Sequence, residues 1–262
     1  MNVRLAIIGG TGVYNPKMLA DLRTFEVNTR YGTALLSQGS YQGQEVVFLA
    51  RHGTKHGIPP HKINYRANIA ALLKVGVEKV LATAAVGSLN ENVPPGSMVL
   101  LEQFLDFTKA REGTFFDGGA AGVVHTDFTA PYCPEINKLL LAAAERATLS
   151  LQSGAVYVCT DGPRFETPAE IRMFKQLGGD LVGMTNVPEV VLAREAGLCY
   201  STLALSTNFA AGISPTVLTH HEVLAMMAEN GEKVRRLLME SIPALVGARN
   251  CHCQSLGSSV PL

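Results

Sequence analysis

The chain has 262 residues, of which 47% are hydrophobic and 17% are charged, a composition typical of a globular protein and not of a disordered one. Lysine plus arginine and aspartate plus glutamate each number 22, so the formal net charge is zero. Because nucleic acids and anionic membranes attract proteins mainly through excess positive charge, this balance predicts neither as a partner. No apolar run is long enough for a signal peptide or a membrane span, and we therefore expect a cytoplasmic protein.

Short apolar runs alternate along the chain with longer stretches of helical character. The runs are rich in Val, Leu, Ile and Ala and show little polar alternation, as in strands that are buried on both faces. The expected strands are Arg4–Ile8, Glu45–Ala50, Lys79–Ala85, Met98–Phe104, Gly154–Thr160 and Cys199–Ser206. The expected helices are Tyr65–Val75, Pro134–Ser150, Pro168–Leu177, Pro188–Ala196 and Thr219–Leu245. The alternation predicts an α/β fold in which helices cover a mostly parallel central sheet.

The chain shows no internal repeat and no linker that would divide it. We expect one domain over residues 1–250 and a loose C-terminal tail over residues 251–262, where glycine and serine residues leave no apolar period. Residues Gly113–Gly122 are expected to form a loop.

The first strand runs into a glycine-rich turn, Gly9-Gly10-Thr11-Gly12. Such a turn can present backbone N–H groups to an anion, or it can be a plain tight turn. A dinucleotide site needs a third glycine at the start of a helix, whereas this chain has Asn15 and Pro16 there. The turn therefore disfavours a nicotinamide-dependent oxidoreductase.

Two further strands end in segments suited to bind an anion. Arg51-His52-Gly53 follows the second expected strand, and arginine offers phosphate oxygens a forked, permanently charged donor. The alternative is an arginine–carboxylate pair at the surface. Ala85-Val86-Gly87-Ser88 ends the next strand, where small side chains would admit either a ligand or a closely packed helix.

Three later segments contain groups suited to a flat, polar ring. Phe165 could stack on such a ring, and Glu166 could accept its N–H groups or simply favour the start of the next helix. Asn208 ends the last strand and offers both a donor and an acceptor. Met184-Thr185 precedes a helix, and Met184 alone would be assigned to the core. Because ligands of α/β folds bind at strand ends, these segments together predict a site for phosphate and a nucleobase.

The five cysteines show no disulfide-scaffold pattern, but Cys251-His252-Cys253 is a close pair. Three interpretations are open: part of a zinc site whose other ligands are not evident nearby, a stabilising disulfide, or part of a loose tail, which we expect. The sequence offers no convincing metal cluster, so neither a metal nor another cofactor is expected.

The motifs above, together with Asn64-Tyr65-Arg66-Ala67-Asn68, resemble those of the trimeric purine nucleoside phosphorylase and methylthioadenosine phosphorylase family over about residues 5–245. The resemblance implies a single-domain fold with a mixed central sheet, assembled as a homotrimer or homohexamer. It also implies a pentosyltransferase that cleaves purine nucleosides with inorganic phosphate as co-substrate.

The resemblance assigns roles to individual residues. The implied phosphate ligands are Thr11, Arg51, His52, the Ala85 backbone N–H and Thr185. The implied nucleoside-binding residues are Phe165, Glu166, Met184, Asn208, His220 and His125, of which His125 would close the neighbouring subunit's site. Asn208 and His52 are the expected catalytic residues: Asn208 would stabilise the departing base and His52 would orient phosphate, which attacks an oxocarbenium-like sugar.

Asn208 and Glu166 also predict the substrate. Methylthioadenosine phosphorylases of the family have Asp in place of Asn208, and adenosine-type members have Ser in place of Glu166. Asn208 can donate to a 6-oxo group or to N7, and Glu166 can accept the N1–H that 6-oxopurines carry. A mismatched purine would leave buried groups unpaired, so we expect inosine and guanosine as substrates.

The segment Thr219-His220-His221-Glu222-Val223 resembles the His-Glu-Glu-Val of ordinary purine nucleoside phosphorylases, which makes His220 the expected partner of the 5′-hydroxyl. The alignment needs a gap, so two alternatives remain: His221 could contact the 5′-hydroxyl instead, or His220 could be a solvent-exposed histidine without this role. The adjacent Arg51-His52 pair is closer to the methylthioadenosine branch and keeps methylthioinosine as an alternative substrate. A non-catalytic nucleoside-binding protein is a further alternative, whereas the lack of an Asp-rich calcium cluster disfavours a nucleoside hydrolase.

Overall fold

The computed structural model describes residues 4–10, 13, 19–54, 56–119, 122–214 and 217–260. Their nine strands form one sheet in the order β2-β3-β4-β1-β5-β8-β7-β6-β9, and β9 also pairs with β5. The strands are β1 (Leu5–Gly9), β2 (Ala20–Thr29), β3 (Gly32–Tyr41), β4 (Gln44–Ala50), β5 (Lys79–Ser88), β6 (Met98–Asp106), β7 (Gln152–Cys159), β8 (Leu181–Gly183) and β9 (Cys199–Phe209). The helices are α1 (Tyr65–Lys74), α2 (Pro134–Arg146), α3 (Pro168–Gln176), α4 (Asn186–Glu195), α5 (His220–Leu245) and α6 (Cys253–Leu256), with a short 3-10 helix η2 (Pro60–Lys62).

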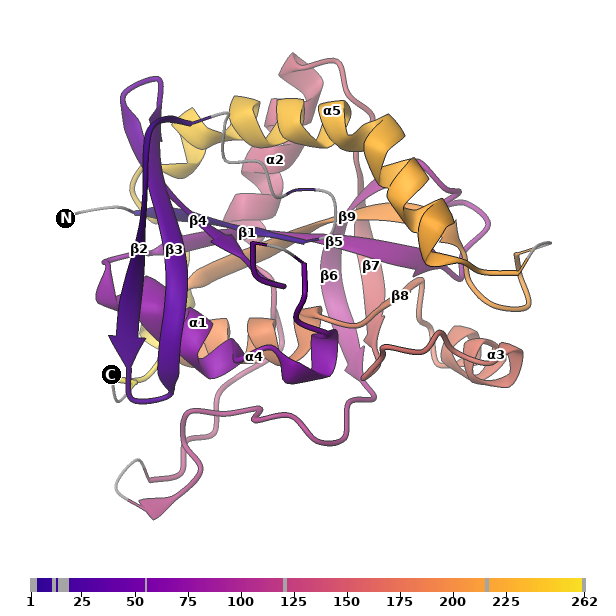
Figure 1. The fold of residues 1–262 in the computed structure, drawn as a ribbon, viewed down its shortest axis with the longest axis horizontal. Coiled ribbons are helices and arrows are strands. Elements are labelled where there is room, and N and C mark those ends of the chain that lie inside the picture. The colour runs from indigo at the N-terminus through magenta and orange to yellow at the C-terminus, as the bar shows by residue number, and fades with distance from the viewer. Residues whose placement is uncertain are drawn as a thin grey trace.

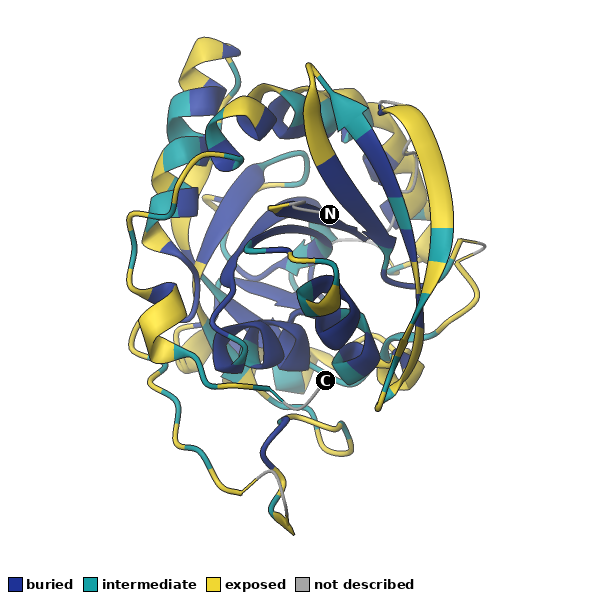
Figure 2. Ribbon diagram, turned by 90° about the vertical axis from the view of Figure 1, so that its left-hand side faces the viewer, coloured by how far each residue is buried: buried dark blue, intermediate teal, exposed yellow. Residues whose placement is uncertain are grey.

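The helices cover both faces of the sheet (Figure 1). Helices α1 and α4 pack on one face in one apolar core, and α2 and α5 pack on the other face in a second core. All five residues of β1 are buried, as the uninterrupted apolar run predicts for a strand covered on both sides. Figure 2 shows the same burial along the central strands, whereas the edge strand β2 is mostly exposed. The predicted α/β fold class is confirmed.

The sheet is mixed, as the resemblance implies: among the described residues, five strand pairings are parallel and four are antiparallel. Strand β1 is parallel to β4 and β5, but the pairs β2–β3, β3–β4, β5–β8 and β6–β9 are antiparallel. Because β9 pairs with both β5 and β6, the strands β5, β8, β7, β6 and β9 close into a ring. The sequence does not predict β2, β3 or β8, because the first two carry polar residues at many positions and β8 has only three residues.

The ends of the helices follow local chemistry. Thr167 and Glu170 form a capping box at the start of α3, and Thr219 and Glu222 form another at the start of α5. Helix α2 ends at Arg146, earlier than the expected Ser150, since the chain turns at Thr148 with a positive φ of 54°. No helix in the described ranges is long and apolar enough to cross a membrane.

Two segments outside the regular elements differ in how they pack. Between β6 and α2, residues 107–119 and 122–133 form an excursion that projects from the body and contains the described residues of the expected 113–122 loop (Figure 1). The C-terminal segment instead packs on the body: Cys253 is 3% exposed, and Val260 contacts the core beneath α1 and α4. The expectation of a loose tail is therefore wrong for residues 251–260.

Candidate active site

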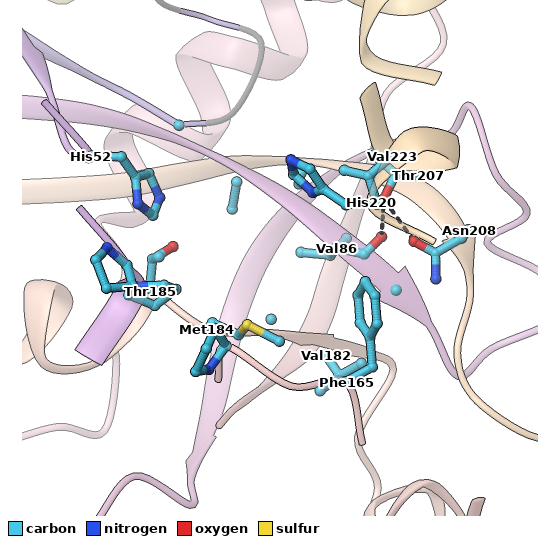
Figure 3. A pocket seen from close by; sticks show the side chains of 18 of the residues that line it. His52, Val86, Phe165, Val182, Met184, Thr185, Thr207, Asn208, His220 and Val223 are labelled. Carbon is cyan, nitrogen blue, oxygen red and sulfur yellow. Dashed lines mark hydrogen bonds between the residues drawn. The ribbon is translucent and has the colours of Figure 1, made fainter. Parts of the chain in front are cut away.

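A cavity of about 590 Å³ lies where several strands of the sheet end. Its lining includes nearly all of the site residues expected from the sequence: Arg51, His52, Ala85, Phe165, Glu166, Met184, Thr185, Asn208 and His220. In Figure 3, His52 and Thr185 lie at one end of the cavity and Phe165 and Asn208 at the other. Thr11 lies outside the described residues. His125 is exposed on the excursion and does not line this cavity.

Arg51, at the end of β4, is held by a buried ion pair. Its Nε and Nη2 donate to the two Glu189 carboxylate oxygens at 2.7 Å, and Nη1 donates to the Thr83 carbonyl at 2.9 Å. Burial alone would lower the pKa of the guanidinium, but the Glu189 carboxylate outweighs it and raises this pKa further. One N–H on each terminal nitrogen remains beyond these bonds, so Arg51 can contact an anion only while it also neutralises Glu189.

His52 lies beside Arg51 in its neutral form. Burial, together with the nearby Arg51 charge, lowers its pKa to about 4, although the bond to the Ile58 carbonyl opposes this change. Its Nδ1 is 2.8 Å from the Ile58 carbonyl oxygen, which only accepts, so Nδ1 carries the proton. Nε2 is therefore an acceptor at neutral pH. It can receive a hydrogen bond from a protonated oxygen of phosphate rather than donate one.

The other end of the cavity presents an acceptor and an aromatic face. Glu166 is 9% exposed, and its Oε1 accepts from the Thr160 hydroxyl at 2.7 Å. Burial raises the pKa of Glu166. Phe165 lines the same end and is 37% exposed, a large apolar side chain that a planar ligand would cover.

The orientation of the Asn208 amide is set by its neighbours. Nδ2 donates to the Phe209 carbonyl at 2.9 Å, and the Thr207 hydroxyl lies 2.9 Å from Oδ1. Because a carbonyl only accepts, the nitrogen must be the atom that faces Phe209, which leaves one N–H for a ligand. The register of β5 and β9 shifts between Val86 and Gly87, opposite Asn208, an irregularity of the kind often found beside active sites.

Met184 lies between the two ends of the cavity (Figure 3). It packs against the turn before Phe165 so closely that a Cβ on Gly162 would be 2.4 Å from its sulfur. Gly162 also has a positive φ of 62°, a conformation that costs other residues energy. Glycine at this position therefore lets the turn and the methionine share one wall of the cavity.

Arg111, on the excursion, does not line the cavity but holds the backbone segments that form one of its walls. The sequence does not predict this role. The Arg111 guanidinium donates to the carbonyls of Val187, Thr160, Asp161 and Met184, at 2.7–3.1 Å for the last three. These carbonyls belong to the two segments that carry Glu166 and Thr185. No local pattern reveals this role, because a lone arginine in a polar loop is ordinarily a surface residue.

Two exposed histidines, His56 and His220, also line the cavity. The centroid of the His56 ring lies 6.3 Å from that of the His220 ring, which is nearly parallel to it, and 4.7 Å from that of the tilted His52 ring. Burial and the neighbouring His220 lower the pKa of His56. His221, the alternative to His220, does not line the cavity. The basic Arg51-to-Gly57 segment is the signal that could have identified His56.

Comparisons with known proteins agree with this geometry. Residues 4–243 match the family described as the phosphorylase superfamily. A Moorella thermoacetica protein named "Probable 6-oxopurine nucleoside phosphorylase" is 59% identical over 251 residues, 96% of each chain. The "6-oxopurine nucleoside phosphorylase" of Pyrococcus furiosus is 50% identical over 96% of each chain. A crystal structure of a methylthioadenosine phosphorylase from an antarctic soil metagenomic library superposes with a TM-score of 0.91 at 35% identity, covering 97% of this chain and 91% of that one.

The family match and these relatives span almost the whole chain, and the cavity gathers the family's expected binding segments at one edge of the sheet. The chain therefore belongs to the phosphorylase superfamily.

Proposed function

We propose that the protein catalyses the reversible phosphorolysis of 6-oxopurine nucleosides, inosine and guanosine, to the free purine and ribose 1-phosphate. The observation that carries this proposal is the amide of Asn208, whose orientation, set by the Phe209 carbonyl, leaves one N–H to donate to the base. Glu166 has the complementary role, because its carboxylate accepts a hydrogen bond and can therefore pair with the purine N1–H. The names of the two close relatives support the same substrate class.

The mechanism follows from the two ends of the cavity. Phosphate lies between Arg51, His52, Ala85 and Thr185, below the sugar carbon that becomes electrophilic as the glycosidic bond breaks. The remaining Asn208 N–H stabilises the negative charge that develops on the purine, a contribution of about 10²–10³ in rate for one donor of this kind. Glu166 and Phe165 hold the base in orientation. Phosphate and nucleoside suffice for these steps, and we propose that no cofactor takes part.

The 5′ end of the sugar supports a second candidate substrate, methylthioinosine. Val223 lies beside His220 in Figure 3, and Leu218 also lines the cavity, so this region offers apolar contacts as well as an imidazole. The imidazole suits a 5′-hydroxyl, and the apolar side chains suit a methylthio group.

The test is phosphate-dependent turnover of the purified protein, without added cofactor, on inosine, guanosine, methylthioinosine and methylthioadenosine. Cleavage of inosine and guanosine supports the proposal. Cleavage of methylthioinosine alone keeps the base assignment but removes His220 from the 5′ site. Preference for methylthioadenosine contradicts the assignment of Asn208, and binding without turnover indicates a nucleoside-binding protein.

We also propose that the protein assembles as a homotrimer, or as a homohexamer made of two such trimers. In this assembly the excursion of one subunit brings His125 to the cavity of the neighbouring subunit. The excursion supports this assembly because it projects from the body and carries Val123, which is 72% exposed. Light scattering measures the mass. A mixture of two inactive proteins, His125→Ala and Glu166→Ala, should regain activity after subunit exchange, because some sites then combine two intact parts. A monomer that is fully active contradicts the proposal.

A further inference from the structure

Four cysteines from distant parts of the chain meet away from the active site. Cys133 precedes α2, Cys199 begins β9, and Cys251 and Cys253 lie in the C-terminal segment. Their Sγ atoms all lie within 4.8 Å of one another. Since β9 runs from Cys199 to Phe209 and carries Asn208 near its far end, the cysteine cluster and the cavity lie at opposite ends of this strand.

The spacing of the sulfur atoms suits a tetrahedral metal ion. Cys251 Sγ is 3.3 Å from Cys199 Sγ and 3.7 Å from Cys133 Sγ. A zinc ion bound to four thiolates at about 2.3 Å holds these sulfurs about 3.8 Å apart, which is close to the spacing found here. The cluster supplies the two ligands that the Cys251-Cys253 pair lacks in its own sequence neighbourhood.

The backbone around the cluster is fixed by hydrogen bonds. The Cys133 N–H donates to the Tyr200 carbonyl at 2.7 Å, and the Cys199 N–H donates to the Glu78 carbonyl at 3.0 Å. The C-terminal segment is anchored by the Asn250 N–H, which donates to the Glu135 carboxylate at 2.9 Å. Three of the four cysteines are buried, and Cys251 is half-buried. A closed metal site needs such preset ligands.

A cation lies next to the thiols. Arg194, on α4, is 4% exposed, and its Nη1 donates to Cys253 Sγ at 3.6 Å. A divalent ion with four thiolates is anionic, so a buried guanidinium and its N–H group stabilise it as an outer partner. Among the described residues, the carboxylate paired with Arg194 is that of Asp127, which is 52% exposed and lies 3.8 Å away, so it screens the guanidinium charge only weakly.

We propose that these four cysteines bind one zinc ion in a closed, structural site that ties the C-terminal segment to β9 and α2. Each thiol that binds releases its proton to solvent, and neither the metal nor the sulfur changes oxidation state. A site with four protein ligands leaves no position for substrate, so its role is stability rather than chemistry. The proposal is independent of the substrate proposed above.

The experiment measures metal and thiols on the full chain, purified with a reductant and without a chelator. Inductively coupled plasma mass spectrometry should measure about one zinc ion bound per chain. Cys253→Ser should lose most of this zinc, whereas Cys159→Ser, a buried cysteine outside the cluster, should retain it. The KM for phosphate and nucleoside should stay the same in both variants, and the metal-free wild-type chain should melt at a lower temperature than the zinc-bound wild-type chain.

A second measurement covers the case in which Cys253→Ser does not fold. The wild-type chain refolded with cobalt(II) should show the intense near-ultraviolet bands of thiolate-to-cobalt charge transfer and visible bands of tetrahedral coordination. Metal-free wild-type protein with all five thiols free after denaturation overturns the proposal. Fewer than five thiols in protein denatured without reductant overturns it as well, because cysteines joined in disulfides do not bind zinc.

Discussion

Arg51 and Glu189, which are 138 residues apart in the chain, are joined by two hydrogen bonds of 2.7 Å and are both about 1% exposed. The Tyr200 hydroxyl donates a third bond to the same carboxylate at 2.7 Å. The pair connects the end of β4 to the first turn of α4, and it places a positive charge at the wall of the cavity. The stability of such a buried ion pair depends on both partners, because removing one leaves the other as an uncompensated buried charge.

Replacing Glu189 with glutamine should destabilise the fold strongly. The amide keeps the shape of the carboxylate but leaves the buried Arg51 charge uncompensated, which typically costs about 3–5 kcal/mol. Urea unfolding followed by circular dichroism measures the loss. Glu240→Gln is the matched control, because its pair with Arg146 is exposed and contributes at most about 1 kcal/mol. Equal, small losses in both variants would show that Arg51 finds another partner.

Asn208→Asp should lower kcat/KM for inosine by about 10²-fold, the effect of losing one preorganised donor. The new carboxylate also faces the Phe209 carbonyl, which accepts the Asn208 N–H at 2.9 Å in the native chain. Activity on adenosine relative to inosine should rise, because a carboxylate accepts from a 6-amino group. Steady-state assays on both nucleosides give the ratio, with the exposed Asn92→Asp as control. An unchanged rate on inosine would remove Asn208 from base recognition.

Arg111→Ala should reduce kcat/KM by about 10- to 100-fold although Arg111 does not line the cavity. The change removes the guanidinium that four backbone carbonyls share as a donor, and it loosens the segments that carry Glu166 and Thr185. Arg111→Lys should recover little, since one ammonium group cannot reach all of these carbonyls. The exposed Arg146→Ala serves as control. A variant of Arg111 with a lower melting temperature but normal kinetics would limit this residue to stability.

The folded protein should lose stability as the pH falls from about 6.5 towards 4, in part because of His52. Its pKa is lowered from 6.5 to about 4 in the folded chain, so the unfolded chain binds the proton first in this range. The contribution is fully present above pH 6.5. His52→Asn keeps a donor to the Ile58 carbonyl but does not titrate, so its melting temperature should fall less between pH 7 and pH 5. Parallel pH profiles for the two proteins would exclude this origin.

The sequence predicts the central strands well and the peripheral ones poorly. Strand β1 and the first nine residues of β9 are buried throughout, and burial on both faces produces the apolar runs that mark them. Strands β2 and β3 form an edge hairpin with many polar residues, so no such run exists. The closure of the ring through β9–β6 depends on pairing between distant residues, which local patterns do not encode.

The residues of the candidate site likewise fall into those that the sequence predicts and those that it does not. Residues that stand at strand ends, such as His52 and Asn208, could be located because the α/β pattern indicates where strands end. Arg111 and the cysteine cluster could not, since their partners are set by tertiary contacts alone. The orientation of the Asn208 amide also comes from its neighbours and not from the residue type. The chemical roles of these residues stay predictions until the variants are measured.

The closed ring of strands has a consequence for the order of folding. The cavity takes residues from near the start of the chain, such as Gly10, and from as late as Val223, and the ring closes only when β9 inserts between β5 and β6. Contacts between such distant residues form slowly, because the intervening chain must first be ordered. No early, compact fragment can therefore hold the nucleoside. During refolding, substrate binding should return with the last structural phase rather than with the first burst of secondary structure.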